Sequence, residues 1–187
     1  MNDFLKGRIK INKLEAARRQ LETAISLYFN GGDPVSTHTL ASAAVEILSD
    51  LNNACNGTPM ITDLEVSGII RPGKMALARQ VFRGPQNFFK HADKDPEAAL
   101  DFHPEFPTVF ILAGVEKYRE LSAENPPLMR VFSLWFRIQW THVFHFPNGE
   151  DRTLKTARSL FNSGDKTKFF ALFLPLYACE AGKAISE

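Results

Sequence analysis

Apolar residues recur every three or four positions along most of the chain, and two early segments show this spacing most clearly. In residues 14–30 the apolar positions are Leu14, Ala17, Leu21, Ala24, Ile25 and Tyr28; in residues 34–53 they are Leu40, Ala43, Ala44, Ile47, Leu48 and Leu51. Spacing of this kind places the apolar side chains on one face of a helix. The pattern therefore predicts two amphipathic helices.

The residues between these two segments are typical of a helix end followed at once by a helix start. Gly31 and Gly32 can supply the left-handed residue that closes a helix. Asp33 can cap the next helix, and Pro34 suits a first helical position because its missing N–H is not needed there. So short a connection predicts an antiparallel hairpin of two long helices.

The rest of the chain also favours helices. We expect helices over residues 72–82, 86–92, 108–121, 126–143, 152–161 and 166–182, with Gly84-Pro85 separating the first two and residues 93–107 forming a long surface loop. Pro175 should kink or end the first half of the last helix. No segment alternates as a strand would. The sequence predicts one all-α domain over residues 1–187, a bundle of roughly seven or eight helices, with residues 1–12 as a flexible N-terminal segment.

The helix expected over residues 126–143 is apolar around most of its circumference. Trp135 and Trp140 are five positions apart, so they point about 140° away from each other on a helix. Core packing is one explanation. An interface between two copies is the other, because aromatic residues are enriched in interface cores. From this second explanation we expect a homodimer.

Composition and charge narrow the class of protein. The chain has 187 residues, 44% of them hydrophobic, and a net charge of +1. This balance excludes a disordered chain and a uniformly basic nucleic-acid coat. The longest apolar run, residues 169–179, is far shorter than the roughly 20 residues of a membrane span, and the N-terminus has no secretory signal pattern. Two isolated cysteines, Cys55 and Cys179, form no metal-binding pair. We expect a cytoplasmic protein without a membrane segment.

The sequence contains none of the common catalytic motifs. It has no phosphate-binding loop, no dinucleotide-binding glycine motif, no zinc-protease motif, no paired Glu-x-x-His and no serine elbow. We therefore expect no metal and no cofactor.

The best candidate for chemistry is the segment 83–91. Asn87 and His91 are four positions apart and share one face of a helix, while Phe88 and Phe89 should turn toward the core. Such an arrangement could position the His91 imidazole for proton transfer. The alternative is that His91 is a structural, hydrogen-bonded histidine.

A run of positive charge overlaps this segment. Residues 66–92 contain no acidic residue but hold Arg71, Lys74, Arg79, Arg83 and Lys90. Cations that lack local counter-charges can bind a phosphate backbone, with Arg79, Arg83 and Lys90 as the candidate ligand contacts. The alternative is an ordinary solvated face that the acidic residues of the following loop neutralise.

His38, on the second predicted helix, is the other candidate ligand-binding residue. Its structural interpretation is a hydrogen bond to nearby backbone or a cap on a neighbouring helix. In its functional interpretation, His38 lies next to His91 across the bundle. The two histidines could then bind a metal together with Asp93 or Asp95.

At Gln86-Asn87-x3-His91 the sequence resembles the HEPN superfamily. The usual motif of that family is an Arg, often followed directly by Asn or another polar residue, and a His, with four to six residues between the Arg and the His. Asn87 and His91 stand at matching positions, and Gln86 stands where the family has Arg. The resemblance implies a small, often dimeric all-α bundle from a bacterial toxin–antitoxin or defence system. Members with the full motif are metal-independent ribonucleases; members without it are thought to be binding or scaffold domains.

Together these observations predict a HEPN-like helical domain that binds RNA or another phosphate-bearing ligand and is non-catalytic or weakly ribonucleolytic. One alternative is a protein-interaction or scaffold module with no ligand chemistry. A second is a metal-dependent enzyme that uses His38 and His91.

Overall fold

A computed structural model of the chain describes residues 7–60, 62, 75–93, 96–139, 152–161 and 164–183, with side chains for all of these except residues 75–81, 153 and 180–183. The described residues form seven helices and no strand. The helices are α1 (Lys13–Phe29), α2 (Pro34–Ala54), α3 (Met75–Lys90), α4 (Pro107–Ser122), α5 (Pro127–Gln139), α6 (Arg152–Leu160) and α7 (Lys166–Lys183). The prediction of an all-α bundle with a long N-terminal hairpin is confirmed.

The hairpin of α1 and α2 has a cap at the start of each helix and a glycine turn between them; the Asp33 cap, Pro34 and the turn are as predicted from the sequence. Asn12 caps α1 by accepting a hydrogen bond from the backbone N–H of Glu15 at 2.8 Å. Asp33 caps α2 by accepting from the backbone N–H of Ser36 at 2.7 Å, with Pro34 in the first helical position. Between the helices, Gly31 has a φ of +67°, which glycine adopts at little cost.

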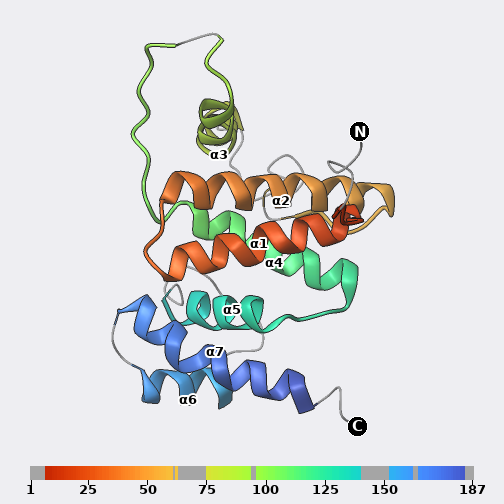
Figure 1. Ribbon diagram of the computed structural model, residues 1–187. Helices are drawn as coiled ribbons and strands as arrows, with labels where there is room; N and C mark the ends of the chain where they lie inside the picture. The colour runs from red at the N-terminus through yellow and green to blue at the C-terminus, as the bar shows by residue number, and fades with distance from the viewer. Residues whose placement is uncertain are drawn as a thin grey trace.

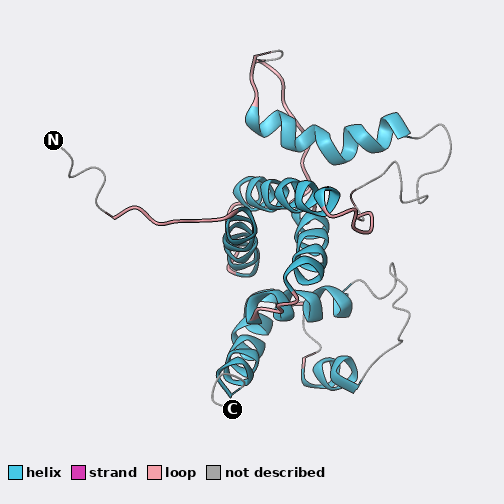
Figure 2. Ribbon diagram, turned by 90° about the vertical axis from the view of Figure 1, so that its right-hand side faces the viewer, coloured by secondary structure: helices cyan, strands magenta, loops and turns pink. Residues whose placement is uncertain are grey.

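The helices stack in layers along the molecule. α2 packs against α1, α3 and α4, and α5 packs against α1, α4, α6 and α7. Figure 1 shows α3 beyond α2 at one end and α6 and α7 beyond α5 at the other. The quarter turn of Figure 2 gives the same order. The two ends of the stack are therefore separate surfaces, each built on a shared centre of α1, α2 and α4.

A cluster of aromatic rings around Phe29 joins this centre to the C-terminal helices. Phe29, the last residue of α1, is fully buried. Its ring stacks on Phe170 of α7 at 4.7 Å between centroids and lies edge-on to Trp135 of α5 at 6.1 Å. The backbone carbonyl of Phe29 also accepts a hydrogen bond from the Thr167 hydroxyl at 2.8 Å. Phe29 thus fixes α1, α5 and α7 relative to one another.

The apolar circumference of α5 is accounted for within one chain. Six of its side chains are buried: Met129, Val131, Phe132, Leu134, Trp135 and Phe136. Four helices of the same chain surround it. A second copy is not needed to cover this helix, and Trp140 lies outside the described residues. The homodimer stays a prediction from the sequence.

One predicted helix boundary is wrong, and of the two outcomes expected at Pro175, a kink or a helix end, the helix end does not occur. The predicted interruption at Gly84-Pro85 is not observed: α3 continues through Pro85 to Lys90. Pro85 is buried, and packing of this side of α3 compensates for the hydrogen bond that the proline removes. Pro175 likewise does not end α7, which continues to Lys183. The segment between α3 and α4 is mostly exposed and contains no helix at 96–106, as predicted.

A buried lysine fixes the segment that follows α2. Lys117 of α4 is only 4% exposed. Its ammonium donates to Asn52 Oδ1 at 3.0 Å and to the Thr58 carbonyl at 2.8 Å, and it pairs with Glu120 at 2.7 Å. A buried charge needs partners of this kind. Cys55 and Cys179 are both exposed free thiols.

Replacement of Phe29 by Ala should lower the free energy of unfolding by about 3–5 kcal/mol, because it removes a fully buried ring and leaves a cavity. Chemical denaturation monitored by circular dichroism would measure the loss. Val35→Ala, at an exposed position of α2, is the control and should change stability by less than about 0.5 kcal/mol. A similar small change for both variants would contradict the role given to Phe29.

Candidate ligand-binding site on α3

α3 divides into a packed side and an exposed side. Pro85 and Gln86 are buried, and Phe82 and Phe89 are half-buried and contact other rings of the chain. These positions recur at helical spacing, so they form the side of α3 that faces the bundle. Arg83, Asn87 and His91 lie on the opposite, exposed side.

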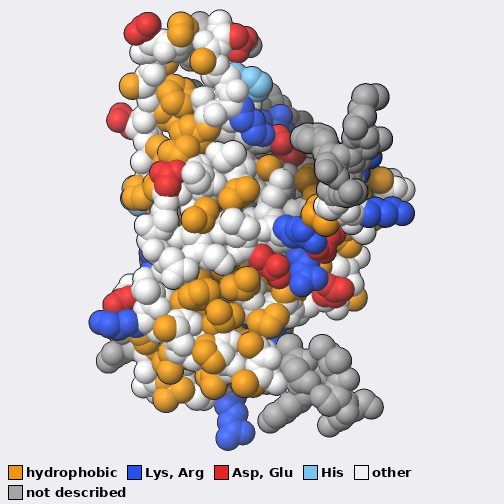
Figure 3. All heavy atoms as spheres, in the orientation of Figure 1, with side chains coloured by type: hydrophobic (Ala, Val, Ile, Leu, Met, Phe, Trp, Pro, Cys, Tyr) orange, Lys and Arg blue, Asp and Glu red, His pale blue; other side chains and the backbone are white. Residues whose placement is uncertain are grey.

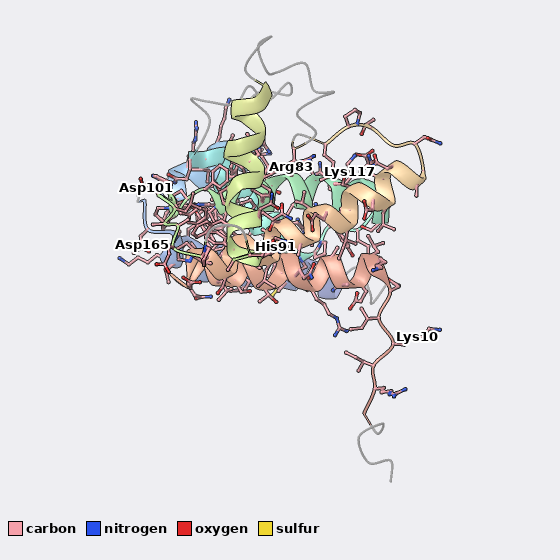
Figure 4. All side chains as sticks on the ribbon, turned by 90° about the horizontal axis from the view of Figure 1, so that it is seen from above. Lys10, Arg83, His91, Asp101, Lys117 and Asp165 are labelled. Carbon is pink, nitrogen blue, oxygen red and sulfur yellow. The ribbon has the colours of Figure 1, made fainter. Side chains whose placement is uncertain are left out.

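Arg83, Asn87 and His91 form what we call the α3 row. They are spaced four positions apart, and the His91 backbone N–H donates to the Asn87 carbonyl at 3.0 Å, so helical geometry extends to His91. Figure 4 labels the two ends of the row, Arg83 on the helix and His91 at its C-terminal end. All three residues are exposed, and within the described part of the chain their side chains have no hydrogen-bond or ion-pair partner.

A cavity of about 340 Å³ lies beside the row. Arg83, Gln86 and Asn87 line it from α3, and Glu46 and Ser49 line it from α2. Its apolar wall is formed by Val45, Phe82 and Phe110. The cavity is therefore apolar on one side and polar on the other, with the Arg83 guanidinium among its polar groups.

Glu46 of α2 holds the packed side of α3 through two contacts. One carboxylate oxygen accepts a hydrogen bond from the Gln86 side-chain amide, and the other lies 3.3 Å from the Lys90 ammonium. Gln86 is only 8% exposed. Consequently the Gln86 amide is already engaged, and the charge of Lys90 is partly neutralised within the chain.

His38 lies in the core, away from the α3 row. It is fully buried, and neither ring nitrogen has a hydrogen-bond partner. Four rings surround it: Phe89 of α3 at 5.8 Å between centroids, Phe102 at 5.4 Å, Phe106 at 5.6 Å, and Phe110 of α4 at 4.7 Å. Burial lowers the pKa of His38 to about 4, and the Lys90 charge contributes in the same direction.

The structure thus brings together only part of the predicted site. Arg83 and Asn87 share a cavity, and His91 continues their row. The expected hydrogen bond of His38 to backbone is absent, so that structural interpretation is corrected to packing against rings. The side chain of Arg79 lies outside the described residues, as do Arg71 and Lys74.

The predicted metal pair is not formed in the described part of the chain. His38 is enclosed by phenylalanine rings, whereas His91 is exposed. No group of three or more His, Cys, Asp or Glu side chains among the described residues is placed to hold a metal ion. Asp95 lies outside those residues.

Glu46 is the residue of this site that sequence reasoning missed. It stands on an ordinary amphipathic helix, 40 positions before the glutamine whose amide it binds. No local pattern indicates a contact over such a separation. The aromatic enclosure of His38 was missed for the same reason, since its rings come from α3, α4 and the loop between them.

These features define a helical bundle with an exposed polar row beside a small cavity. Comparison of the chain with protein-family models, with curated proteins and with solved structures gave no match. Among the described residues, no helix has both the length and the apolar character that crossing a membrane requires.

The buried state of His38 predicts a pH dependence of stability. The pKa is about 4 in the folded chain and near 6.5 in the unfolded one, so below pH 6.5 the unfolded chain binds a proton that the folded chain does not. Stability should therefore fall between pH 6.5 and pH 4, by roughly 3 kcal/mol from this residue. Denaturant titrations at several pH values, compared with His38→Leu, would measure it. An equally steep fall in His38→Leu would assign the effect to other groups.

Proposed function

We propose that this chain is a HEPN-like helical domain that binds a phosphate-bearing ligand. The ligand class that we propose is RNA, and the domain binds it without cleaving it. The observation that carries the proposal is the α3 row. Arg83 is an exposed cation with no ion-pair partner among the described residues, and it is followed along the same helix face by the Asn87 amide and the His91 imidazole.

The chemistry of the row suits a phosphate group. A guanidinium can donate two parallel hydrogen bonds to a phosphate, and it keeps its charge throughout the physiological pH range. Amide and imidazole groups are common additional donors to phosphate and sugar oxygens. The neighbouring cavity, with Phe82 and Phe110 in its wall, leaves space for an apolar part of a ligand beside the charged row.

The contacts of Gln86 favour binding without catalysis. Gln86 stands where the resemblance would require an arginine, and its neutral amide is bound to Glu46. A neutral amide at this position cannot supply the positive charge that would stabilise the negative charge developing on a phosphate during cleavage. We extend the proposal to a cytoplasmic location, for which two free thiols are typical.

A protein-interaction module is the second candidate function. It is favoured by exposed leucines on α6 and α7, at the end of the molecule opposite α3. The third possibility, a metal-dependent enzyme using His38, has no support in the aromatic surroundings of that residue.

RNA binding should depend on Arg83 and on salt. Affinity for a labelled single-stranded RNA should fall steeply as salt rises, because bound counterions are released on association. Arg83→Ala should weaken binding. It should also reduce the slope of log affinity against log salt by about one, the value expected for the loss of one phosphate contact. Fluorescence anisotropy would measure both. Lys10→Ala, in the exposed N-terminal segment, is the control and should keep the natural affinity. Equal losses for the two variants would contradict a site on α3.

Loss of the His91 imidazole should affect ligand binding but not folding. Because His91 is exposed and unpartnered, His91→Ala should shift the melting temperature by no more than about 2 °C. The same variant should bind RNA more weakly. The natural protein should leave labelled RNA intact on gel electrophoresis. RNA cleavage by the natural protein that His91→Ala abolishes would show that the domain is an enzyme.

A further inference from the structure

The outward side of α7 is apolar although it faces away from the core. Its exposed residues include Ala171, Leu172, Pro175, Leu176 and Cys179, which recur at helical spacing and carry no charge. Leu172 is 46% exposed and Leu176 is 54% exposed. In Figure 3, hydrophobic side chains gather over the part of the molecule that α5, α6 and α7 form. Single exposed leucines are ordinary, but a contiguous apolar stripe marks an interaction surface.

A groove runs beside this stripe, between α6 and α7. It has a volume of about 350 Å³ and a floor of Leu134, Ala157 and Phe173. Leu160 of α6, which is 63% exposed, and Leu176 of α7 form its walls. The groove is therefore apolar inside and is bordered by leucines that already lie at the surface. We call this surface the α6–α7 groove.

The described charged side chains that line the groove, or follow it on α6, are cations. Arg152 of α6 lines it, and Lys155 follows one turn later on the same helix. No acidic residue is among the described residues that line the groove. Both cations are exposed, and neither forms an ion pair within the described residues.

We propose that the α6–α7 groove binds an amphipathic helix of another protein, with apolar residues at every third or fourth position and acidic residues along their flank. The apolar stripe of such a helix would cover Leu160, Leu172 and Leu176, as helices do in hydrophobic grooves. Its carboxylates would meet Arg152 and Lys155, for which the described residues provide no ion-pair partner.

Charge also distinguishes this partner from a second copy of the chain. A two-fold dimer joins the same surface patch of both copies. Each copy would then present Arg152 and Lys155 to a face that carries the same two cations and, among the described residues, no acidic lining. The groove lies at the opposite end of the molecule from α3, so the inference is independent of the proposed RNA binding.

Two synthetic probe peptides of about 18 residues, long enough for five helical turns, would test the proposal. Both carry the same leucine stripe; one is flanked by glutamates and the other by lysines. Fluorescence anisotropy with the full chain should show the glutamate peptide binding at least about tenfold more tightly. Leu172→Ser and Leu176→Ser should each weaken this binding about tenfold or more. Val35→Ser, at an exposed position of α2, is the matched control and should leave it unchanged.

A charge-reversed chain, Arg152→Glu with Lys155→Glu, should prefer the lysine peptide. Both positions are exposed, so the variant should melt close to the natural protein, and Lys10→Glu serves as its control. Equal binding of the two peptides, binding that the leucine changes leave intact, or no binding of either peptide would overturn the proposal. Sedimentation that shows a dimer which Leu172→Ser dissociates would also overturn it, because the groove would then belong to a second copy.

Discussion

The arrangement of this bundle depends on the burial of Phe29 at the end of α1. The hairpin of α1 and α2 contributes mainly small and branched side chains to the core. The C-terminal helices reach that centre mainly through rings: Phe29 stacks on Phe170, and the rings of Phe132 and Trp135 lie edge-on to it. Edge-to-face and offset contacts of this kind are directional, so they fix angles as well as distances between helices. The position of α7, and with it the α6–α7 groove, follows from this one cluster.

A second aromatic cluster, around His38, gives α3 its orientation. α3 packs mainly against α2, and its Phe82 ring also contacts Phe110 of α4. The rings of Phe89, Phe102 and Phe106 close over His38 and connect α3 and the following loop to the core. Glu46 adds a polar contact on the same side of α3. Because these contacts occupy one side of the helix, Arg83, Asn87 and His91 are left on the other. His38, which the sequence predicts as a ligand contact, instead packs among the rings that orient α3. This packing leaves the α3 row exposed.

The two surfaces differ in what they offer a partner. The α3 row is polar and has one unpaired guanidinium beside a small cavity, which suits an anion. The α6–α7 groove is apolar with cations at its border, which suits the apolar face of an acidic helix. Since they lie at opposite ends of the stack, both could be occupied at once. A module that connects a phosphate-bearing ligand to a protein partner is consistent with both surfaces.

The sequence by itself determined the helices of this protein, because helical periodicity, caps and glycine stops are local properties. The bounds of α1, α2 and α4 agree with the predicted segments to within a residue or so, and Asp33 and Pro34 start α2 as expected. The same local rules failed at Pro85, where burial of the proline against the bundle outweighs the backbone hydrogen bond that it removes. Asn87 and His91 could be placed on one helix face from their spacing alone. Only the tertiary structure decided two features of the site. These are the enclosure of His38 by phenylalanines and the contacts of Glu46 with Gln86 and Lys90. These contacts join residues about 40 to 70 positions apart, and no local pattern along the chain carries information about which distant side chains packing brings together.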